Sequence, residues 1–335
     1  MNVKLPTEYD IGRAYMGTPL SFSLQQIMEC QRNRYPMLFI DFVEECVPGQ
    51  FARGRKLFTI NEWFFHGYET AEPKVWNAIQ IEAMSQMFLM TFLSLKEVKG
   101  SVAMSSKFDN VNFFKKIEPG DVLDIDAQLK SFRHGVARGS VEGRVNGDIA
   151  CNMECTILVP DSLRIPVSPK KDEPRSMVPH RAPQNSGMST RQIRECLLNI
   201  YPWLLIDKVL EIIPGERLRA IKNFTYNEHF FPDHFPGDPS VPGFIQIECC
   251  MQAFLLSFLS LDEHKRSETA DRALDKVRLR RKIIPGEQLE LGVVLESFRR
   301  GVAKGSVEGF VNGEPAISLE ATVVIPDAMV RLKPN

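Results

Sequence analysis

The chain contains one domain-sized sequence twice, at a constant spacing of 166 residues. Phe132 to Pro160 matches Phe298 to Pro326 at 17 of 29 positions without a gap. The Tyr-Pro pair that begins at Tyr35 recurs at Tyr201. Since there are only two copies, the repeat indicates a fused dimer of one fold and not a solenoid.

The repeat and the composition together divide the chain of 335 residues into five segments. A chain of this length is expected to form two cores. The segment between the copies contains five prolines among Lys, Ser and Asn, which is typical of an extended linker. We expect an N-terminal arm (1–22), a first domain (23–160), a linker (161–188), a second domain (189–328) and a tail (329–335).

Composition and charge exclude several classes of protein. The net charge of −1 argues against a nucleic-acid binder. The longest apolar stretch, Ala78 to Leu95, is interrupted by Gln80, Glu82 and Gln86, so it is expected to be a buried helix and not a membrane span. The chain begins without a basic and apolar signal segment, which favours a cytoplasmic protein.

The cysteines fit the same interpretation. There are seven, an odd number, their neighbours are apolar, and no CxxC pair occurs. Cys151 and Cys155 alternate with Met153 on one face of an expected strand, which favours packing over metal binding. We expect reduced core thiols, no metal site and no bound cofactor.

Two kinds of periodicity predict an α+β fold in each copy. Leu123 to Leu129 alternates apolar and polar residues, as a half-buried strand does, and later strands are expected at 139–145 and 150–159. The Asn-Gly pair at residues 146–147 predicts the hairpin between them. Ile79 to Leu95 and Ile245 to Leu261 are apolar on nearly all faces, so each is expected to be a helix surrounded by protein.

A buried helix wrapped by a curved antiparallel sheet resembles the hotdog fold. A short helix near residues 26–31 completes this arrangement. The two copies are therefore predicted to form a double hotdog, in which both sheets join into one continuous sheet across a pseudo-dimer.

The second copy carries the motif that identifies a family. His-Phe-Pro-Gly occurs at residues 234–237, Pro-Gly at 242–243, and a helical Glu248 is followed by Gln252. This set resembles the β-hydroxyacyl-acyl carrier protein dehydratases of the FabZ/FabA group over about residues 189–326. The glutamate is FabZ-like and Gly237-Asp238-Pro239 is FabA-like, so isomerisation of the enoyl product stays open.

The chemistry of such a dehydration supports the resemblance. A 3-hydroxyacyl thioester must lose an α-proton to a base, and His234 titrates close to working pH. A carboxyl group on an apolar helix has a raised pKa and therefore stays protonated as the acid. Free amides at the helix start by Gly243 would polarise the thioester carbonyl, although this glycine also has a simple packing explanation.

The first copy departs from the motif. Tyr68 stands at the position of His234, and Trp76-Asn77 replaces Pro242-Gly243, whereas Glu82 is retained. In the family resembled, the histidine and the acid come from opposite subunits. This implies that His234 faces Glu82 in a working site, and that Glu248 faces Tyr68 in a degenerate one. A second live site that uses His66 is the weaker alternative.

A basic run in the second copy is the candidate partner surface. It contains Arg278, Arg280, Arg281 and Lys282, and the equivalent residues of the first copy carry less charge. The resemblance implies an acidic acyl carrier protein that delivers the substrate on phosphopantetheine. A solvated sheet edge is the competing interpretation, and further homodimerisation of the pseudo-dimer stays open.

The sequence thus predicts a dehydratase that forms trans-2-enoyl thioesters in fatty acid, polyunsaturated fatty acid or polyketide synthesis. One alternative is a hotdog acyl thioesterase, which has no use for the complete His-Phe-Pro-Gly loop. Another is a non-catalytic acyl-binding or scaffold protein, against which the retained His234 and both glutamates argue. The sequence does not give the length of the acyl chain.

Overall fold

The computed structural model describes residues 18–67, 73–162, 187–235 and 237–330. Most of the predicted linker, of the tail and of the N-terminal arm (163–186, 331–335 and 1–17) therefore lies outside the described residues. In the first part of the chain the elements are β1 (Leu20–Phe22), α1 (Leu24–Cys30), β2 (Phe42–Val47), β3 (Phe51–Leu57), η1 (Trp63–Gly67), α2 (Asn77–Leu93), β4 (Met104–Phe113), β5 (Val122–Arg133), β6 (Val136–Val145), β7 (Asp148–Leu158) and η2 (Pro160–Ser162).

The second part repeats the order of a short helix, two strands, a long helix and four strands, as the constant spacing predicts. Its elements are α3 (Thr190–Cys196), β8 (Lys208–Ile213), β9 (Arg217–Asn223), α4 (Gly243–Leu259), η3 (Asp262–His264), β10 (Ala270–Leu279), β11 (Gln288–Arg299), β12 (Val302–Val311), β13 (Glu314–Val324) and α5 (Pro326–Val330).

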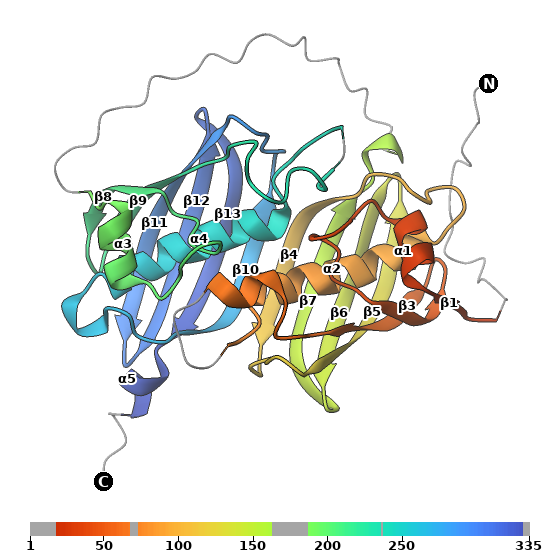
Figure 1. Cartoon of the computed structure of the whole chain (residues 1–335), viewed down its shortest axis with the longest axis horizontal. Helices are drawn as coiled ribbons and strands as arrows, with labels where there is room; N and C mark the ends of the chain where they lie inside the picture. The colour runs from red at the N-terminus through yellow and green to blue at the C-terminus, as the bar shows by residue number, and fades with distance from the viewer. Residues whose placement is uncertain (1–17, 68–72, 163–186, 236, 331–335) are drawn as a thin grey trace.

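All the described strands belong to one antiparallel sheet of thirteen strands (Figure 1). Its order is β1-β2-β3-β5-β6-β7-β4-β10-β13-β12-β11-β9-β8. The two copies meet where β4 pairs with β10, with Lys107 opposite Arg278 and Asn112 opposite Ala273. Shifting each residue by 166 exchanges these two pairs, so the junction has the symmetry of a homodimer interface. The predicted continuous sheet is confirmed.

The outer edges of the sheet also correspond to each other. At one edge Phe22 of β1 pairs with Val43. At the other edge Met188 forms a single bridge with Val209, which is 166 residues after Val43. β1 lies within the segment predicted as an N-terminal arm, and its pairing extends the sheet by one short strand.

The two long helices lie across the same face of the sheet, in contact with each other (Figure 1). All but two of the 17 residues of α2 are buried, and the exceptions are Asn77 and Glu82. In α4 all residues except Gly243 are buried. This confirms the prediction that both helices are surrounded by protein. They begin and end two residues earlier than the apolar pattern predicts.

Close contact between helix and sheet requires one glycine in each copy. A Cβ atom at Gly139 would lie 2.1 Å from the carbonyl oxygen of Gln128 and 2.4 Å from the Phe88 ring. The equivalent Gly305 would meet Val294 and Phe254 in the same way. Only glycine lets the helix approach the strand so closely at these two positions.

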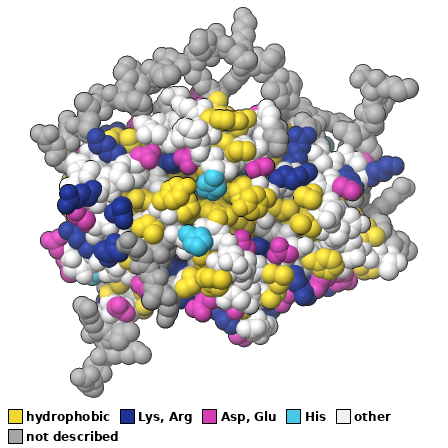
Figure 2. Space-filling model, in the orientation of Figure 1, with side chains coloured by type: hydrophobic (Ala, Val, Ile, Leu, Met, Phe, Trp, Pro, Cys, Tyr) yellow, Lys and Arg dark blue, Asp and Glu magenta, His cyan; other side chains and the backbone are white. Residues whose placement is uncertain are grey.

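Aromatic side chains join the copies on the helical face. The Trp63 ring of the first copy lies 5.3 Å from the Trp203 ring and 4.6 Å from the His229 ring of the second. Figure 2 shows that apolar side chains form a band across the middle of this face, while Lys and Arg gather mostly toward its ends. The contact between the copies is therefore largely apolar on the helical side.

The buried cysteines belong to the core. All seven lie in the described parts of the chain, are buried and form no disulfide bond. Cys151 and Cys155 point inward from β7 together with Met153, as the alternation predicts. None of the described helices is long and apolar enough to cross a membrane.

Candidate active site

The predicted base lies on a loop that leads into α4, and backbone contacts fix its ring. The Nδ1 atom of His234 lies 2.9 Å from the carbonyl oxygen of Ser240, and the Ser240 amide donates to the His234 carbonyl at 2.8 Å. A carbonyl oxygen only accepts hydrogen bonds, so Nδ1 carries the proton and Nε2 of the neutral ring is left with a lone pair.

Burial keeps this ring neutral. Loss of hydration lowers the pKa of His234 to about 4, and the hydrogen bond to Ser240 offsets part of this effect. The residue is half-buried and lines a cavity. At neutral pH, His234 therefore offers an unprotonated nitrogen, as a general base must.

The predicted acid, Glu82, projects from the middle of α2. Its Oε1 atom accepts a hydrogen bond of 2.8 Å from Nε2 of Gln86, one helical turn later. Gln86 is itself fixed, since its Nε2 donates to the Met37 carbonyl and its Oε1 accepts from the Phe39 amide. Burial raises the pKa of Glu82 to about 7, and the Gln86 contact offsets this only in part. Much of Glu82 is therefore protonated near neutral pH.

His234 and Glu82, from different copies, line one cavity of about 360 Å³. Gly243 and the basic residues Arg280, Arg281 and Lys282 line it as well. Glu248, on the same copy as His234, lines a different cavity. The structure thus brings His234 together with Glu82 and separates it from Glu248.

The start of α4 adds hydrogen-bond donors to this cavity. The first amides of a helix have no partner within the helix, and they carry the positive end of its dipole. A Cβ atom added at Gly243 would lie 3.0 Å from Leu279 and 3.8 Å from Ser105, so glycine keeps this approach open. The cavity therefore brings together a neutral imidazole, a carboxyl group with a raised pKa and the start of a helix.

A second cavity, of about 270 Å³, is related to the first by the repeat. Glu248 lines it and accepts a 2.9 Å hydrogen bond from Gln252, as Glu82 does from Gln86. Burial raises the pKa of Glu248 to about 8. Tyr68, the predicted counterpart of His234, lies outside the described residues. His66 is exposed on η1 and is not among the residues that line either cavity.

Three polar residues of the second cavity were not identified as a group from the sequence. Lys74, Asn77 and Asp271 stand at the positions of Ser240, Gly243 and Ser105 in the first cavity. Their departure from the repeat is the signal that marks these three positions in the sequence. The role of the Ser240 carbonyl was missed as well, and because it is a backbone contact it leaves no mark on residue type.

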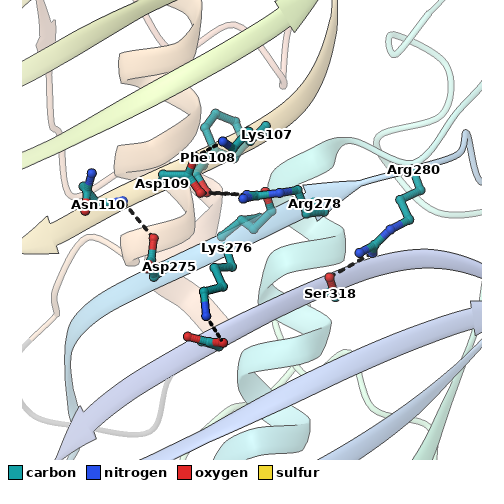
Figure 3. A network of polar contacts seen from close by, with 11 residues as sticks. Lys107, Phe108, Asp109, Asn110, Asp275, Lys276, Arg278, Arg280 and Ser318 are labelled. Carbon is teal, nitrogen blue, oxygen red and sulfur yellow. Dashed lines mark hydrogen bonds and ion pairs between the residues drawn. The ribbon is translucent and has the colours of Figure 1, made fainter.

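The basic run divides between the sheet junction and the cavity. Figure 3 shows Arg278 reaching from β10 to Asp109 on β4, where the ion pair measures 2.7 Å. Arg280 is exposed and donates to Ser318, whereas Arg281 pairs with Glu287 at 2.6 Å and Lys282 pairs with Asp238. Three of the four predicted contact residues thus surround the cavity, and Arg278 joins the two copies.

Two hotdog halves that share one sheet, and that both contribute to one cavity, define a double hotdog protein. A family model described as FabA-like domain matches the chain twice, at residues 32–154 and 198–320. The chain therefore belongs to the FabA-like domain family, with two domains fused in one polypeptide. Both the predicted fold and the predicted family are confirmed.

Curated relatives correspond in length to one of the two copies. The 3-hydroxyacyl-[acyl-carrier-protein] dehydratase FabZ of Enterococcus faecalis is 41% identical over 138 residues, which is 41% of this chain and 98% of the relative. The FabZ of Oenococcus oeni is 36% identical over 138 residues, or 41% of this chain and 99% of the relative.

A solved structure resembles the whole arrangement. The dehydratase domain from the CurJ module of the curacin polyketide synthase covers 87% of this chain and 98% of its own length, with a TM-score of 0.55. At 10% identity this likeness bears on the fold alone. Among the described residues no group of three or more His, Cys, Asp or Glu is arranged to hold a metal ion.

Proposed function

We propose that this protein removes water from 3-hydroxyacyl thioesters to form trans-2-enoyl thioesters, with His234 as the base and Glu82 as the acid. The observation that carries the proposal is the pairing in one cavity of a neutral imidazole and a carboxyl group whose pKa is raised to about 7. Environments that separate the pKa values of two groups in this way are suited to acid–base chemistry. The FabZ relatives bear names of the same activity.

The proposed reaction proceeds as follows. Nε2 of His234 takes the proton from C2 of the substrate while the amides at the start of α4 stabilise the negative charge on the thioester oxygen. Glu82 gives its proton to the hydroxyl at C3, which leaves as water, and the C2–C3 double bond forms. The imidazolium and the carboxylate then exchange the proton through solvent, which restores the starting state.

The proposed substrate arrives on the phosphopantetheine of an acidic acyl carrier protein. Arg280, Arg281 and Lys282 lie at the cavity and carry positive charge that an acidic carrier would meet. Arg278 and Arg281 belong to the same predicted contact, but their pairing with Asp109 and Glu287 makes them the weaker contributors. The pathway would be fatty acid, polyunsaturated fatty acid or polyketide synthesis, in the cytoplasm, where buried thiols such as these stay reduced.

A pair of matched substitutions tests the proposal. Glu82→Gln keeps the shape of the side chain and removes its proton-donating carboxyl, so kcat for enoyl formation should fall by about 100-fold or more. Glu248→Gln makes the same change in the other cavity, so kcat should stay within about twofold. Enoyl formation would be followed by ultraviolet absorbance of the conjugated thioester.

Three outcomes would contradict the proposal. Loss of activity with Glu248→Gln but not with Glu82→Gln would place the acid on the same copy as the histidine. Release of free thiol without enoyl formation would favour a thioesterase. No turnover of any acyl thioester would favour a binding or scaffold protein.

A further inference from the structure

The second cavity, which contains Glu248, has walls suited to an alkyl chain. Met251, Leu255 and Leu259 follow one another at intervals of four residues along α4, so they form one stripe of the helix. The first cavity has Ser85 and Leu89 at the positions of Met251 and Leu255. At these two helix positions the second cavity is therefore more apolar than the first.

The mouth of the second cavity is basic, like that of the first. Lys115 and Lys116 line it and stand 166 residues before Arg281 and Lys282. Lys115 pairs with Asp148 at 3.3 Å and Lys116 with Glu118 at 3.0 Å, and both lysine side chains are 36% exposed. Exposed ion pairs of this kind are weak, so an incoming phosphate would exchange with them readily.

The polar end of the second cavity differs from the active one. Asn77 begins α2 with a side chain where α4 begins with Gly243, and its Nδ2 donates to Asp271 at 3.0 Å. Lys74 donates to the Thr269 carbonyl at 2.9 Å. Both contacts join the two copies. They lie at the position where the first cavity has the start of α4 without a side chain. Among the described residues no histidine lines the second cavity, and the helix start that faces it carries the Asn77 side chain in place of a glycine.

Both cavities share one unsatisfied acceptor. Gln80 lines the second cavity and Gln246 the first, and the two are equivalent in the repeat. Each is at least 95% buried, and neither Oε1 atom has a hydrogen-bond partner among the described residues. A buried acceptor without a partner is unfavourable, so a ligand with an N–H or O–H group would be stabilised here.

We infer that the second cavity binds an acyl chain carried on phosphopantetheine and holds it without dehydrating it. The apolar stripe contacts the acyl chain. Gln80, Glu248 and Asp271 accept amide or hydroxyl hydrogens, and Lys115 and Lys116 bind the phosphate. This inference rests on the proposed function, because it assigns the same class of ligand to both cavities. Each chain then holds two acyl groups and converts one.

Equilibrium dialysis of the full chain against the decyl thioether of phosphopantetheine tests the inference, since this probe has no thioester to react. The wild type should bind two equivalents. Leu255→Trp should remove one of them by filling the second cavity, and the matched Leu89→Trp should remove the other, since both leucines are 8% exposed. The double variant should bind none.

A surface substitution keeps the test decisive if a tryptophan variant does not fold. Lys116→Glu reverses the charge at the mouth of the second cavity, and Lys282→Glu does so at the first. Each should weaken one of the two affinities by about tenfold and leave the other as it was. A wild type that binds a single equivalent, or a Lys116→Glu variant with unchanged affinities, would overturn the inference.

The result separates this inference from the proposed function. If the wild type forms enoyl product but binds one equivalent, the inference of a second site is wrong and the proposed reaction is retained. If the wild type binds two equivalents but forms no enoyl product, the second site is supported and the proposed reaction is wrong.

Discussion

The two long helices, α2 and α4, carry the same Glu and Gln pair but begin differently. In the cavity that contains His234, α4 begins with Gly243, which has no side chain. In the other cavity, α2 begins with Asn77, whose side chain is hydrogen-bonded. Each cavity takes its loop from one copy and its glutamate from the other. Loss of one histidine therefore alters one cavity and leaves the other complete, while both glutamates keep equivalent glutamine partners.

Removal of the remaining histidine should have the largest effect on this comparison. His234→Ala should lower kcat/KM by about 1000-fold, because a positioned base contributes on the order of 100- to 10,000-fold. His66→Ala is the control in the other copy and should leave the rate unchanged, since His66 is exposed and lines neither cavity. Steady-state enoyl formation measures both. An equal loss in the His66 variant would make the first copy catalytic.

The pH dependence should report both members of the proposed acid–base pair. The base must be neutral, so the rate should rise as pH increases through about 4, the pKa of His234. The acid must be protonated, so the rate should fall about tenfold per pH unit above about 7, the pKa of Glu82.

A kcat/KM profile over this range gives the measurement, and the residual activity of Glu82→Gln should lose the alkaline decline. A rate that keeps rising beyond pH 8 would contradict the assignment of the acid.

The stability of the folded protein should depend on the ionisation of Glu248, which lines the second cavity. The pKa of Glu248 is about 8 in the folded protein against an ordinary value of 4.5. The unfolded chain therefore ionises first as pH rises, and the folded state loses stability between these two values. Glu248→Gln removes this loss, so Tm should rise by several degrees above pH 8 and change little near pH 5.

Differential scanning calorimetry at both pH values checks this, with Glu82→Gln as the matched variant and a smaller expected gain. A gain of equal size at both pH values would show that the effect comes from packing and not from ionisation.

The junction between the copies should give the smallest effect. Arg278→Gln breaks the ion pair with Asp109, whose side chains are 30% and 19% exposed, so unfolding free energy should fall by about 1 kcal/mol. Lys276→Gln breaks a pair whose side chains are 62% and 46% exposed, and it should change almost nothing. Urea unfolding compares them. Equal losses of unfolding free energy in the two variants would show that burial of an ion pair at the junction does not increase its contribution to stability.

Much of the fold followed from the repeat and from two unusually apolar helices. A helix without a polar face must be covered, and two equivalent copies on one chain reproduce a dimer. The ends of α2 and α4 were predicted two residues late, because the apolar pattern begins at Ile79 and Ile245 while the helices begin at Asn77 and Gly243. Gly243 is a weak helix former, so its residue type gives no sign of a helix start.

The candidate site was predictable only where residue type carries the chemistry. His234, Glu82 and Gly243 were named from their motif and from the repeat. The hydrogen bond from His234 to the Ser240 carbonyl was not predictable, because any residue at position 240 has a backbone carbonyl. The contact between Asn77 and Asp271 joins residues 194 positions apart, and it depends on how β10 lies against the start of α2. No local pattern reports such a contact.

The continuous sheet through β4 and β10 has a consequence for inheritance. In a homodimer every substitution appears twice, so a change that improves one pocket must also be tolerated in its twin. Here one gene encodes both halves, so they cannot be exchanged between molecules. A substitution in one half therefore appears at one position only. One pocket is then free to drift in sequence while the other stays under selection.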